Sequence, residues 1–187
     1  MPAVEVRPEP LGSPVAHRLI AELNAELSRD YPPAQRFHSL AAEEVADGAG
    51  AFLVVWLGGA PAGCGAVRML SPEVAELKRM YVVPDSRGQG LSRVILRELE
   101  ARAVALGALR VVLETGDKAL AALALYESAA YARIPCFGAY AASPTSICFE
   151  KRLARRNRPR TRTASSGEPE LPNWGLFSED AADPAGR

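Results

Sequence analysis

Residues 76–92 decide the fold, and they read Glu76-Leu77-Lys78-Arg79-Met80-Tyr81-Val82-Val83-Pro84-Asp85-Ser86-Arg87-Gly88-Gln89-Gly90-Leu91-Ser92. The first part is rich in apolar and β-branched residues and stops at a proline, which is typical of a strand that ends there. The second part has two glycines, followed by apolar residues at helical spacing up to residue 106. The stretch therefore predicts a strand, a turn and the beginning of a helix.

The turn in this stretch is a candidate phosphate site. The first amides of a helix have no partner within it, and together with the helix dipole they attract anions. Gly88 and Gly90 would let the backbone approach a ligand closely. A dinucleotide-binding turn would need a third glycine where Arg93 stands, and the chain has no Walker motif. An ordinary strand-to-helix turn is the alternative interpretation.

Further strand patterns lie on both sides of this stretch. Val4 and Val6 indicate a short first strand, and Gly58-Gly59 is typical of a hairpin turn. The other predicted strands cover residues 51–57, 62–70, 73–83, 109–114, 131–134 and 146–153. Consecutive hairpins predict antiparallel pairing over the first part of the sheet.

Helical patterns separate several of these strands. Ser13 is a candidate N-cap, with Pro14 at the first helical position, and Gly107 fits a C-terminal cap. The predicted helices cover residues 14–29, 40–46, 91–106 and 118–129. A helix between two strands implies a right-handed parallel crossover. The sequence thus predicts a mixed sheet of six to seven strands with about four helices, in an α/β or α+β domain.

Composition excludes few partners. The chain has 187 residues, 48% of them hydrophobic, with a formal net charge of zero and a pI near 6.8, so one domain with an extension is expected. The charge does not favour nucleic acid. No apolar run is long enough for a membrane span, and no signal peptide is evident, so we expect a cytoplasmic protein. The spacing of Cys64, Cys136 and Cys148 fits neither a zinc site nor a disulfide framework, so reduced thiols and no bound metal are expected.

The composition changes after Leu153. Five arginines between residues 155 and 162 are followed by serine, proline and acidic residues, which predicts a disordered tail over 154–187. An apolar island at Trp174, Leu176 and Phe177 could dock on a partner or on the domain itself. Nonspecific nucleic-acid binding by the arginines is a rival function, but the acidic stretch opposes it.

Three segments resemble the GNAT superfamily of N-acetyltransferases. The strand ending in Val82-Val83-Pro84 and the following Arg87-Gly88-Gln89-Gly90 are similar to the core motif of that family. Residues 124–131 resemble its second motif, and residues 146–153 resemble the closing strand of many bacterial members. The resemblance covers about residues 51–153. It implies a largely antiparallel twisted sheet with a splayed, parallel central pair, in a domain spanning residues 1–153.

The resemblance also implies a bound acetyl-coenzyme A as co-substrate. Its pantetheine arm would enter the gap between the splayed strands and contact Met80, Tyr81 and Val82. Its pyrophosphate would bind the turn and the first residues of the helix, namely Arg87, Gly88, Gln89, Gly90, Leu91 and Ser92. Ser92 stands where the family prefers glycine or alanine, and Ala119 replaces a cofactor-contacting amide residue. These departures motivate a non-catalytic acyl-coenzyme A sensor as another alternative.

Two residues match the catalytic groups of the family. Tyr126 matches the general acid that protonates the departing thiolate, or else it is an aromatic residue of the core. Glu76 resembles the catalytic base of histone-acetylating relatives. Alternation along the strand would place it on the same face as Lys78, Met80 and Val82. Glu114, or a chain of water molecules, could serve as the base instead.

The acceptor is less defined. The resemblance implies direct attack of a primary amine on the thioester in a ternary complex, by a monomer or a homodimer. Tyr31, Phe37, Phe137 and Tyr140 could line the acceptor side or could fill a core edge. A small amine is the favoured substrate, with a protein lysine or N-terminus as the alternative.

Overall fold

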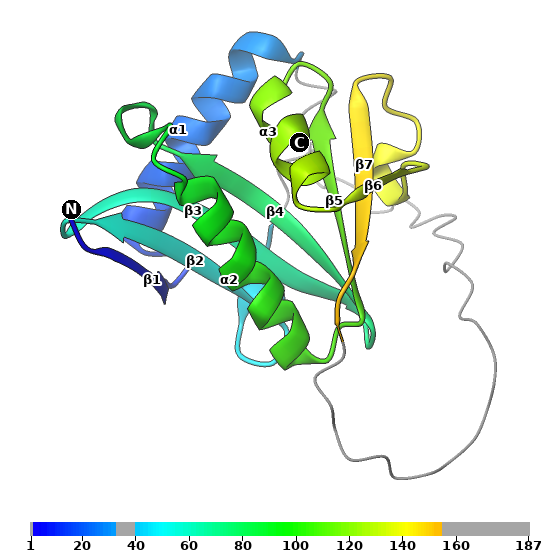
Figure 1. Cartoon of the computed structure of the whole chain (residues 1–187), viewed down its shortest axis with the longest axis horizontal. Helices are drawn as coiled ribbons and strands as arrows, with labels where there is room; N and C mark the ends of the chain where they lie inside the picture. Colours follow the sequence, from blue (N-terminus) through cyan, green and yellow to red (C-terminus); the bar gives the residue numbers. More distant parts are fainter. Residues whose placement is uncertain (1, 33–39, 155–187) are drawn as a thin grey trace, which may run out of the picture.

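The computed structural model describes residues 2–32 and 40–154. Within them, seven strands form one sheet in the order β1-β2-β3-β4-β5-β7-β6 (Figure 1). The strands are β1 Val4–Pro8, β2 Gly50–Leu57, β3 Ala60–Ser71, β4 Val74–Val82, β5 Arg110–Gly116, β6 Ala132–Ile134 and β7 Ser146–Arg152. Every neighbouring pair is antiparallel except β4 and β5, which are parallel. The predicted mixed, largely antiparallel sheet is confirmed.

The helices begin and end close to the predicted positions. They are α1 Pro14–Asp30, α2 Leu91–Leu106 and α3 Leu120–Ser128. Ser13 caps α1 by accepting a hydrogen bond from the amide of Ala16 at 3.1 Å, and Gly107 ends α2 with a left-handed φ of 102°. The helix expected over residues 40–46 is a 3₁₀ helix, Ala42–Val45, so the described residues hold three α-helices instead of about four.

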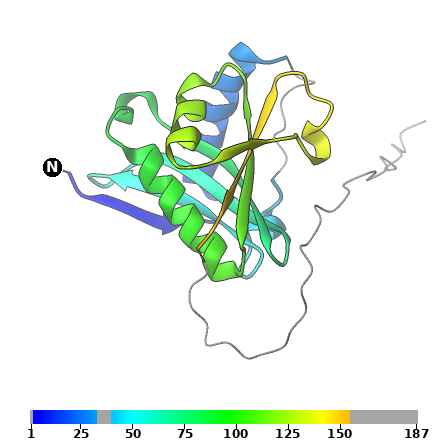
Figure 2. The ribbon, with the colours of Figure 1, turned by 45° about the vertical axis from the view of Figure 1, so that its right-hand side comes forward.

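The helices cover both faces of the sheet. In Figures 1 and 2, α1 lies on one face, and α2 and α3 lie on the other. Alternation along β2 supplies both cores: Val55 packs in the core with Leu99 of α2, whereas Val54 packs in the core with Leu19 of α1. The strands in the middle of the sheet are therefore buried on both sides.

A β-bulge divides β4 into two halves. Arg79 has a φ of 58°, and the pairing with β3 shifts there, because Ala66 pairs with Lys78 but Cys64 pairs with Tyr81. The extra residue on β4 bends the strand and interrupts its ladder.

The bulge also reverses the alternation of side chains. Tyr81 packs in the core beside α1, whereas Met80 and Val82 pack against the core beneath α2. The prediction that Glu76 shares its face with Met80 and Val82 is therefore wrong, because simple alternation cannot register an inserted residue. The predicted shared face of Glu76 and Lys78 is correct, because both residues precede the bulge.

The parallel pair separates at the bulge. Pairing between β4 and β5 runs from Val74 opposite Arg110 to Leu77 opposite Leu113 and ends there. Beyond this point β4 stays paired with β3, and β5 stays paired with β7. Figure 1 shows the two strands leaning apart toward the end of the sheet that carries α3. The splayed central pair implied by the resemblance is present.

Two of the three cysteines form a disulfide, contrary to the expectation of reduced thiols. Ile134 of β6 is paired with Cys148 of β7, and the chain stays close enough for Cys136 to reach Cys148, with a Cα–Cα distance of 5.1 Å. The partners come together through strand pairing, which their spacing in sequence does not reveal. Cys64 is buried and free, and burial raises its pKa to about 12.

Some predictions lie outside the described residues. They include the disordered tail, apart from its first residue, the apolar island around Trp174, and the acceptor-side role of Phe37. In the part of the chain that the structure describes, none of the helices has both the length and the apolar character to cross a bilayer.

The close contact between β3 and β4 predicts the effect of a one-carbon change. A Cβ at Gly63 would clash with the backbone carbonyl of Tyr81. Because the clash is with backbone, the rotation of a side chain cannot remove it. Gly63→Ala is therefore expected to lower the free energy of unfolding by about 1–3 kcal/mol in chemical denaturation.

Gly12→Ala is the matched control, because a Cβ there meets nothing within 4 Å. Its free energy of unfolding should stay within about 0.5 kcal/mol of the starting protein. Equal stability of the two variants would contradict the close strand contact.

Candidate active site

One cavity follows the gap between β4 and β5. Its volume is about 640 Å³, within the usual range for small-molecule sites. Its walls come from α1, from the second half of β4, from the turn before α2, from the end of β5 and from α3. Segments far apart in sequence thus meet around one space. The cavity has a glycine-rich end at α2 and a polar end near Lys78 and Tyr140.

The glycine-rich end has the geometry of an anion site. Gly88 and Gly90 have left-handed φ values of 75° and 78°, which favour glycine. Within the described chain, the backbone amides of residues 88–90 donate to no backbone carbonyl, and the first amides of α2 follow directly. Of the predicted cofactor residues in this segment, Arg87, Gly88, Gly90, Leu91 and Ser92 line the cavity, but Gln89 does not.

The side chain of Arg87 is engaged within the protein. Its Nη2 contacts Oε2 of Glu26 at 2.6 Å, and its Nε donates to the carbonyl of Val82 at 3.0 Å. Both Arg87 and Glu26 line the cavity. The pairing with Glu26 joins α1 to the turn, and the sequence pattern gave no sign of it.

The wall from β4 turns a backbone amide toward the gap. Met80, Tyr81 and Val82, the residues predicted to contact the pantetheine arm, all line the cavity. The amide of Val83 donates to Ala62 of β3 at 2.9 Å, so alternation turns the amide of Val82 toward the gap. An extended ligand in the gap could pair with this edge as another strand would.

Tyr126 reaches the cavity from α3. It is only 4% exposed, and its ring contacts the rings of Tyr131 and Phe149. Burial, with a smaller effect of Glu114, raises its pKa, so the hydroxyl stays protonated at neutral pH. Among residues 2–32 and 40–154, no group is hydrogen bonded to this hydroxyl. A proton donor is therefore held in place at the cavity.

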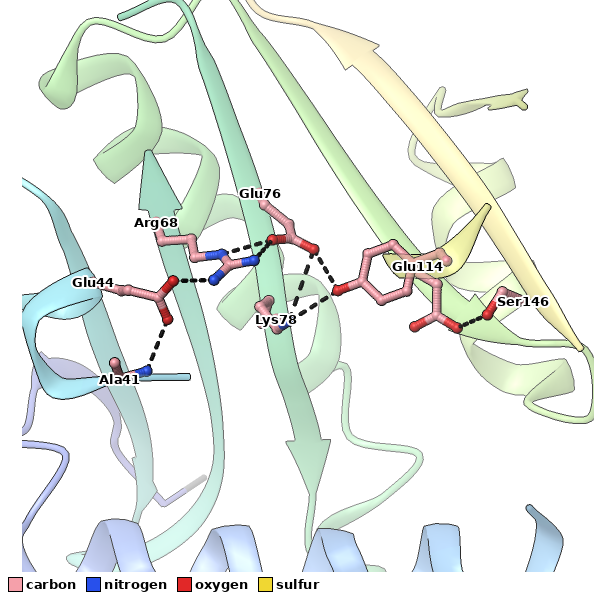
Figure 3. Close-up of polar contacts among 8 residues, drawn as sticks. Ala41, Glu44, Arg68, Glu76, Lys78, Glu114 and Ser146 are labelled. Carbon is pink, nitrogen blue, oxygen red and sulfur yellow. Dashed lines mark hydrogen bonds and ion pairs between the residues drawn. The ribbon is translucent and has the colours of Figure 1, made fainter. Parts of the chain in front are cut away.

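Glu76 lies in a buried polar network beside the cavity. It is 1% exposed, Arg68 Nε donates to its Oε2 at 2.7 Å, and the hydroxyl of Tyr140 donates to its Oε1 at 2.6 Å (Figure 3). Arg68 also pairs with Glu44, which accepts from the amide of Ala41. Both oxygens of Glu76 are occupied, and Glu76 is not among the residues that line the cavity.

Glu114 does line the cavity. It stands at the end of β5, where Ser146 donates to its Oε1 at 2.6 Å (Figure 3). Burial raises its pKa, while the Ser146 hydrogen bond and the charge of Lys78 lower it in part. This carboxylate can exchange a proton with a ligand, whereas Glu76 is held by two donors.

The predicted acceptor-side aromatics fall into two groups. Tyr31 and Tyr140 line the cavity, and the Tyr31 hydroxyl accepts a hydrogen bond from the amide of Lys118 at 2.8 Å. Phe137 packs edge-on against Tyr140 with ring centroids 5.4 Å apart, so it supports the wall without lining it. The described residues contain no group of three or more His, Cys, Asp or Glu suited to a metal ion.

Comparison with known proteins agrees with this geometry. The acetyltransferase (GNAT) family matches residues 16–131. An IAA acetyltransferase of Azospirillum brasilense is 36% identical over 155 residues, which are 82% of this chain and 100% of that protein. The chain therefore belongs to the GNAT acetyltransferase family.

Solved structures share the fold. A Klebsiella pneumoniae protein, provisionally assigned as an acyl-CoA N-acyltransferase, has a TM-score of 0.69 at 28% identity over 81% of this chain and 98% of its own. A GNAT acetyltransferase of Elizabethkingia anophelis with acetyl-CoA bound has a TM-score of 0.57 at 16% identity. The match covers 80% of this chain and 98% of that protein. The prediction of an acetyl-CoA-dependent acyltransferase of this family is confirmed.

The network around Glu76 predicts a large stability effect. Arg68→Met would leave the Glu76 carboxylate buried without its cation, and we expect a loss of about 3–5 kcal/mol in the free energy of unfolding. Replacing both Arg68 and Glu76 by methionine should recover part of this loss, because the buried carboxylate is then removed with its cation. The recovery is only partial, because Lys78 and Glu44 each lose a partner.

Arg133→Met is the matched control, since Arg133 and Glu127 form an ion pair in which both side chains are more than half exposed. Its effect should stay below about 1 kcal/mol. Equal losses for the two single variants would show that the buried network does not hold Glu76 as described.

Proposed function

We propose that this protein transfers the acetyl group of acetyl-CoA to a primary amine on a small molecule, by direct attack in a ternary complex. The observation that carries the proposal is one continuous cavity that joins the glycine-rich turn of α2, the open edge of β4 and the hydroxyl of Tyr126. A donor in the β4–β5 gap would place its thioester between the two ends of the cavity.

The described residues fit the donor. The free amides at residues 88–90 and the start of α2 suit a pyrophosphate. Met80, Tyr81 and Val82 suit a pantetheine arm, which carries amide groups that can pair with a strand edge. Arg87 would add positive charge once it turns from Glu26 to the phosphate. Ser92 also lines this end, and its small side chain leaves room for the ligand.

We assign the general acid to Tyr126. Amine attack on the thioester expels a thiolate, and a protonated phenol nearby can donate to it. The raised pKa of Tyr126 keeps that proton available.

We assign the general base to Glu114 in preference to Glu76. A base must take a proton from the attacking ammonium, and Glu114 has a carboxylate that faces the cavity. Glu76 uses both oxygens on Arg68 and Tyr140, so we propose a positioning role for it, through Tyr140 and Lys78.

Two other functions use the same cavity. A protein lysine or N-terminus could replace the small amine, and a sensor could bind acyl-CoA without turnover. Tyr31, Tyr140 and Lys78 line the cavity, and these aromatic and charged side chains suit a small polar molecule. The free hydroxyl of Tyr126 favours turnover over sensing.

The test is thiol release from acetyl-CoA with small amines, with IAA, and with lysine-containing and N-terminal peptides as acceptors. Binding of acetyl-CoA is followed calorimetrically in parallel. Acceptor-dependent release with a small amine is expected. Release with peptides alone would favour the protein acceptor, binding without release would favour the sensor, and no binding would contradict the proposal.

Tyr126→Phe tests the general acid. It removes only the hydroxyl and keeps the ring contacts with Tyr131 and Phe149. Steady-state kinetics should show kcat lowered by about 10²–10⁴-fold, with the affinity for acetyl-CoA little changed.

Tyr131→Phe is the control, because its hydroxyl binds Glu100 and Tyr131 is not among the residues that line the cavity. It should leave kcat unchanged. A Tyr126→Phe enzyme with undiminished kcat would remove the acid role.

The pH dependence tests the general base. Glu114 must be ionised to accept a proton, so kcat/KM should fall as pH falls through its pKa, which lies above the ordinary value near 4.5. Glu114→Gln should lower the rate by about 10²–10⁴-fold and remove this limb of the profile.

Ser146→Ala should shift the pH profile without removing the carboxylate of Glu114. Ser146 stabilises the ionised carboxylate, so its loss raises the pKa of Glu114 and moves the acid limb to higher pH. The plateau at high pH should stay nearly constant. A profile that does not move in Ser146→Ala would exclude Glu114 as the titrating group.

A further inference from the structure

We propose that the acceptor is an amine that also carries a carboxylate, as amino acids do, and that Lys78 binds this carboxylate. The inference rests on the proposed acetyl transfer and names the class of its acceptor. Lys78 lies on β4 just before the bulge and lines the cavity at the end away from the glycine-rich turn. A cation at this place would favour amines that also carry a negatively charged group.

Lys78 is buried and held in place. Its side chain is 6% exposed, and Nζ donates to the hydroxyl of Tyr140 at 2.9 Å. Nζ also lies over the ring of Tyr140, 5.5 Å from its centroid. An ammonium has three N–H donors, and within the described residues the only hydrogen bond it donates goes to Tyr140. Two donors are left for a ligand in the cavity.

The nearest carboxylate does not neutralise Lys78 well. Glu76 Oε1 is 4.0 Å from Nζ, beyond hydrogen-bond distance. The other oxygen of Glu76 is bound by Arg68, and the same Oε1 accepts the Tyr140 proton at 2.6 Å. Arg68 pairs with both Glu44 and Glu76, so neither carboxylate is hydrogen bonded to Lys78. A carboxylate in the cavity would be a hydrogen-bonded partner for Lys78.

The local field is also favourable to an anion. Burial lowers the pKa of Lys78, Glu76 and Glu44 raise it in part, and Arg68 and Arg79 lower it further as like charges. Arg79 lines the cavity as well. A bound carboxylate would offset the cost of burying the Lys78 ammonium.

An anionic group on the other side of the cavity completes the acceptor site. Figure 3 shows Glu114 on β5 and Lys78 on β4, the two strands that border the cavity. A zwitterionic acceptor could place its carboxylate at Lys78 and its amine toward Glu114. A protein lysine lacks the carboxylate and would bring a second cation close to Lys78, which costs free energy.

The test compares acids with their carboxamides. The acceptors are alanine, β-alanine, phenylalanine and 4-aminobutyrate, each beside its carboxamide, with kcat/KM measured for acetylation. Ligand-observed NMR in the presence of coenzyme A measures binding of the same pairs without turnover. At least one acid should be preferred over its carboxamide.

Lys78→Met should reduce the preference for that acid by about 10- to 100-fold, mainly through KM, as expected for loss of a charged hydrogen bond. The comparison between variants cancels the different basicity of acid and amide. Lys151→Met is the matched control, because Lys151 pairs with Glu100 and is not among the residues that line the cavity. It should keep the preference.

Equal use of acids and carboxamides by the starting protein would overturn the inference while leaving acetyl transfer intact. So would a preference that survives in Lys78→Met. If no amine is acetylated, the proposed function fails, and NMR still decides the inference. Acid binding that is lost in Lys78→Met supports it, and the absence of any acid binding overturns it.

Discussion

The separation of β4 from β5 after Leu77 and Leu113 is the constraint on which the site depends. A parallel pair in the middle of a sheet would normally stay paired, and its backbone groups would satisfy one another. Here the bulge at Arg79 bends β4, so the edges of both strands remain open over the cavity. The residues proposed for the donor site, for the general acid and for the acceptor all lie along this opening.

The opening in the sheet leaves charged side chains buried next to the cavity. A chain of ion pairs and hydrogen bonds provides most of them with partners. Glu44, Arg68 and Glu76 alternate in sign from the 3₁₀ helix to β4, and Tyr140 joins Glu76 to Lys78. The pairing fixes the position of each side chain, because breaking one contact would leave a buried charge uncompensated. Among the described residues, Glu114 accepts a side-chain hydrogen bond from Ser146 alone. Both oxygens of Glu76 are thus engaged, whereas Glu114 accepts at one oxygen, which suits the proton exchange proposed for it.

Much of this arrangement could be predicted from the sequence. Prolines, glycines and apolar periodicity fixed the strands on both sides of the Gly58-Gly59 turn, and Ser13 and Gly107 marked the ends of helices. The glycine-rich turn predicted a phosphate site, since the chemistry of such a site depends on backbone groups adjacent in the chain.

Features that depend on distant contacts could not be predicted. The bulge at Arg79 inserts a residue without any glycine or proline to mark it, so the faces of Met80 and Val82 were assigned wrongly. The pairing of Cys136 with Cys148 arises from the antiparallel strands β6 and β7. Glu76 and Glu114 are both glutamates on predicted strands, and the sequence does not show which of them has partners for both carboxylate oxygens. Only the positions of Arg68 and Tyr140 distinguish the held carboxylate from the free one.

Hydrogen–deuterium exchange of backbone amides, with and without acetyl-CoA, tests most directly that the opening between β4 and β5 is the donor site. Bound acetyl-CoA should slow exchange in two segments, residues 80–82 on β4 and residues 88–92 at the start of α2. Unchanged exchange in both segments at saturating acetyl-CoA, or protection that appears elsewhere instead, would contradict it.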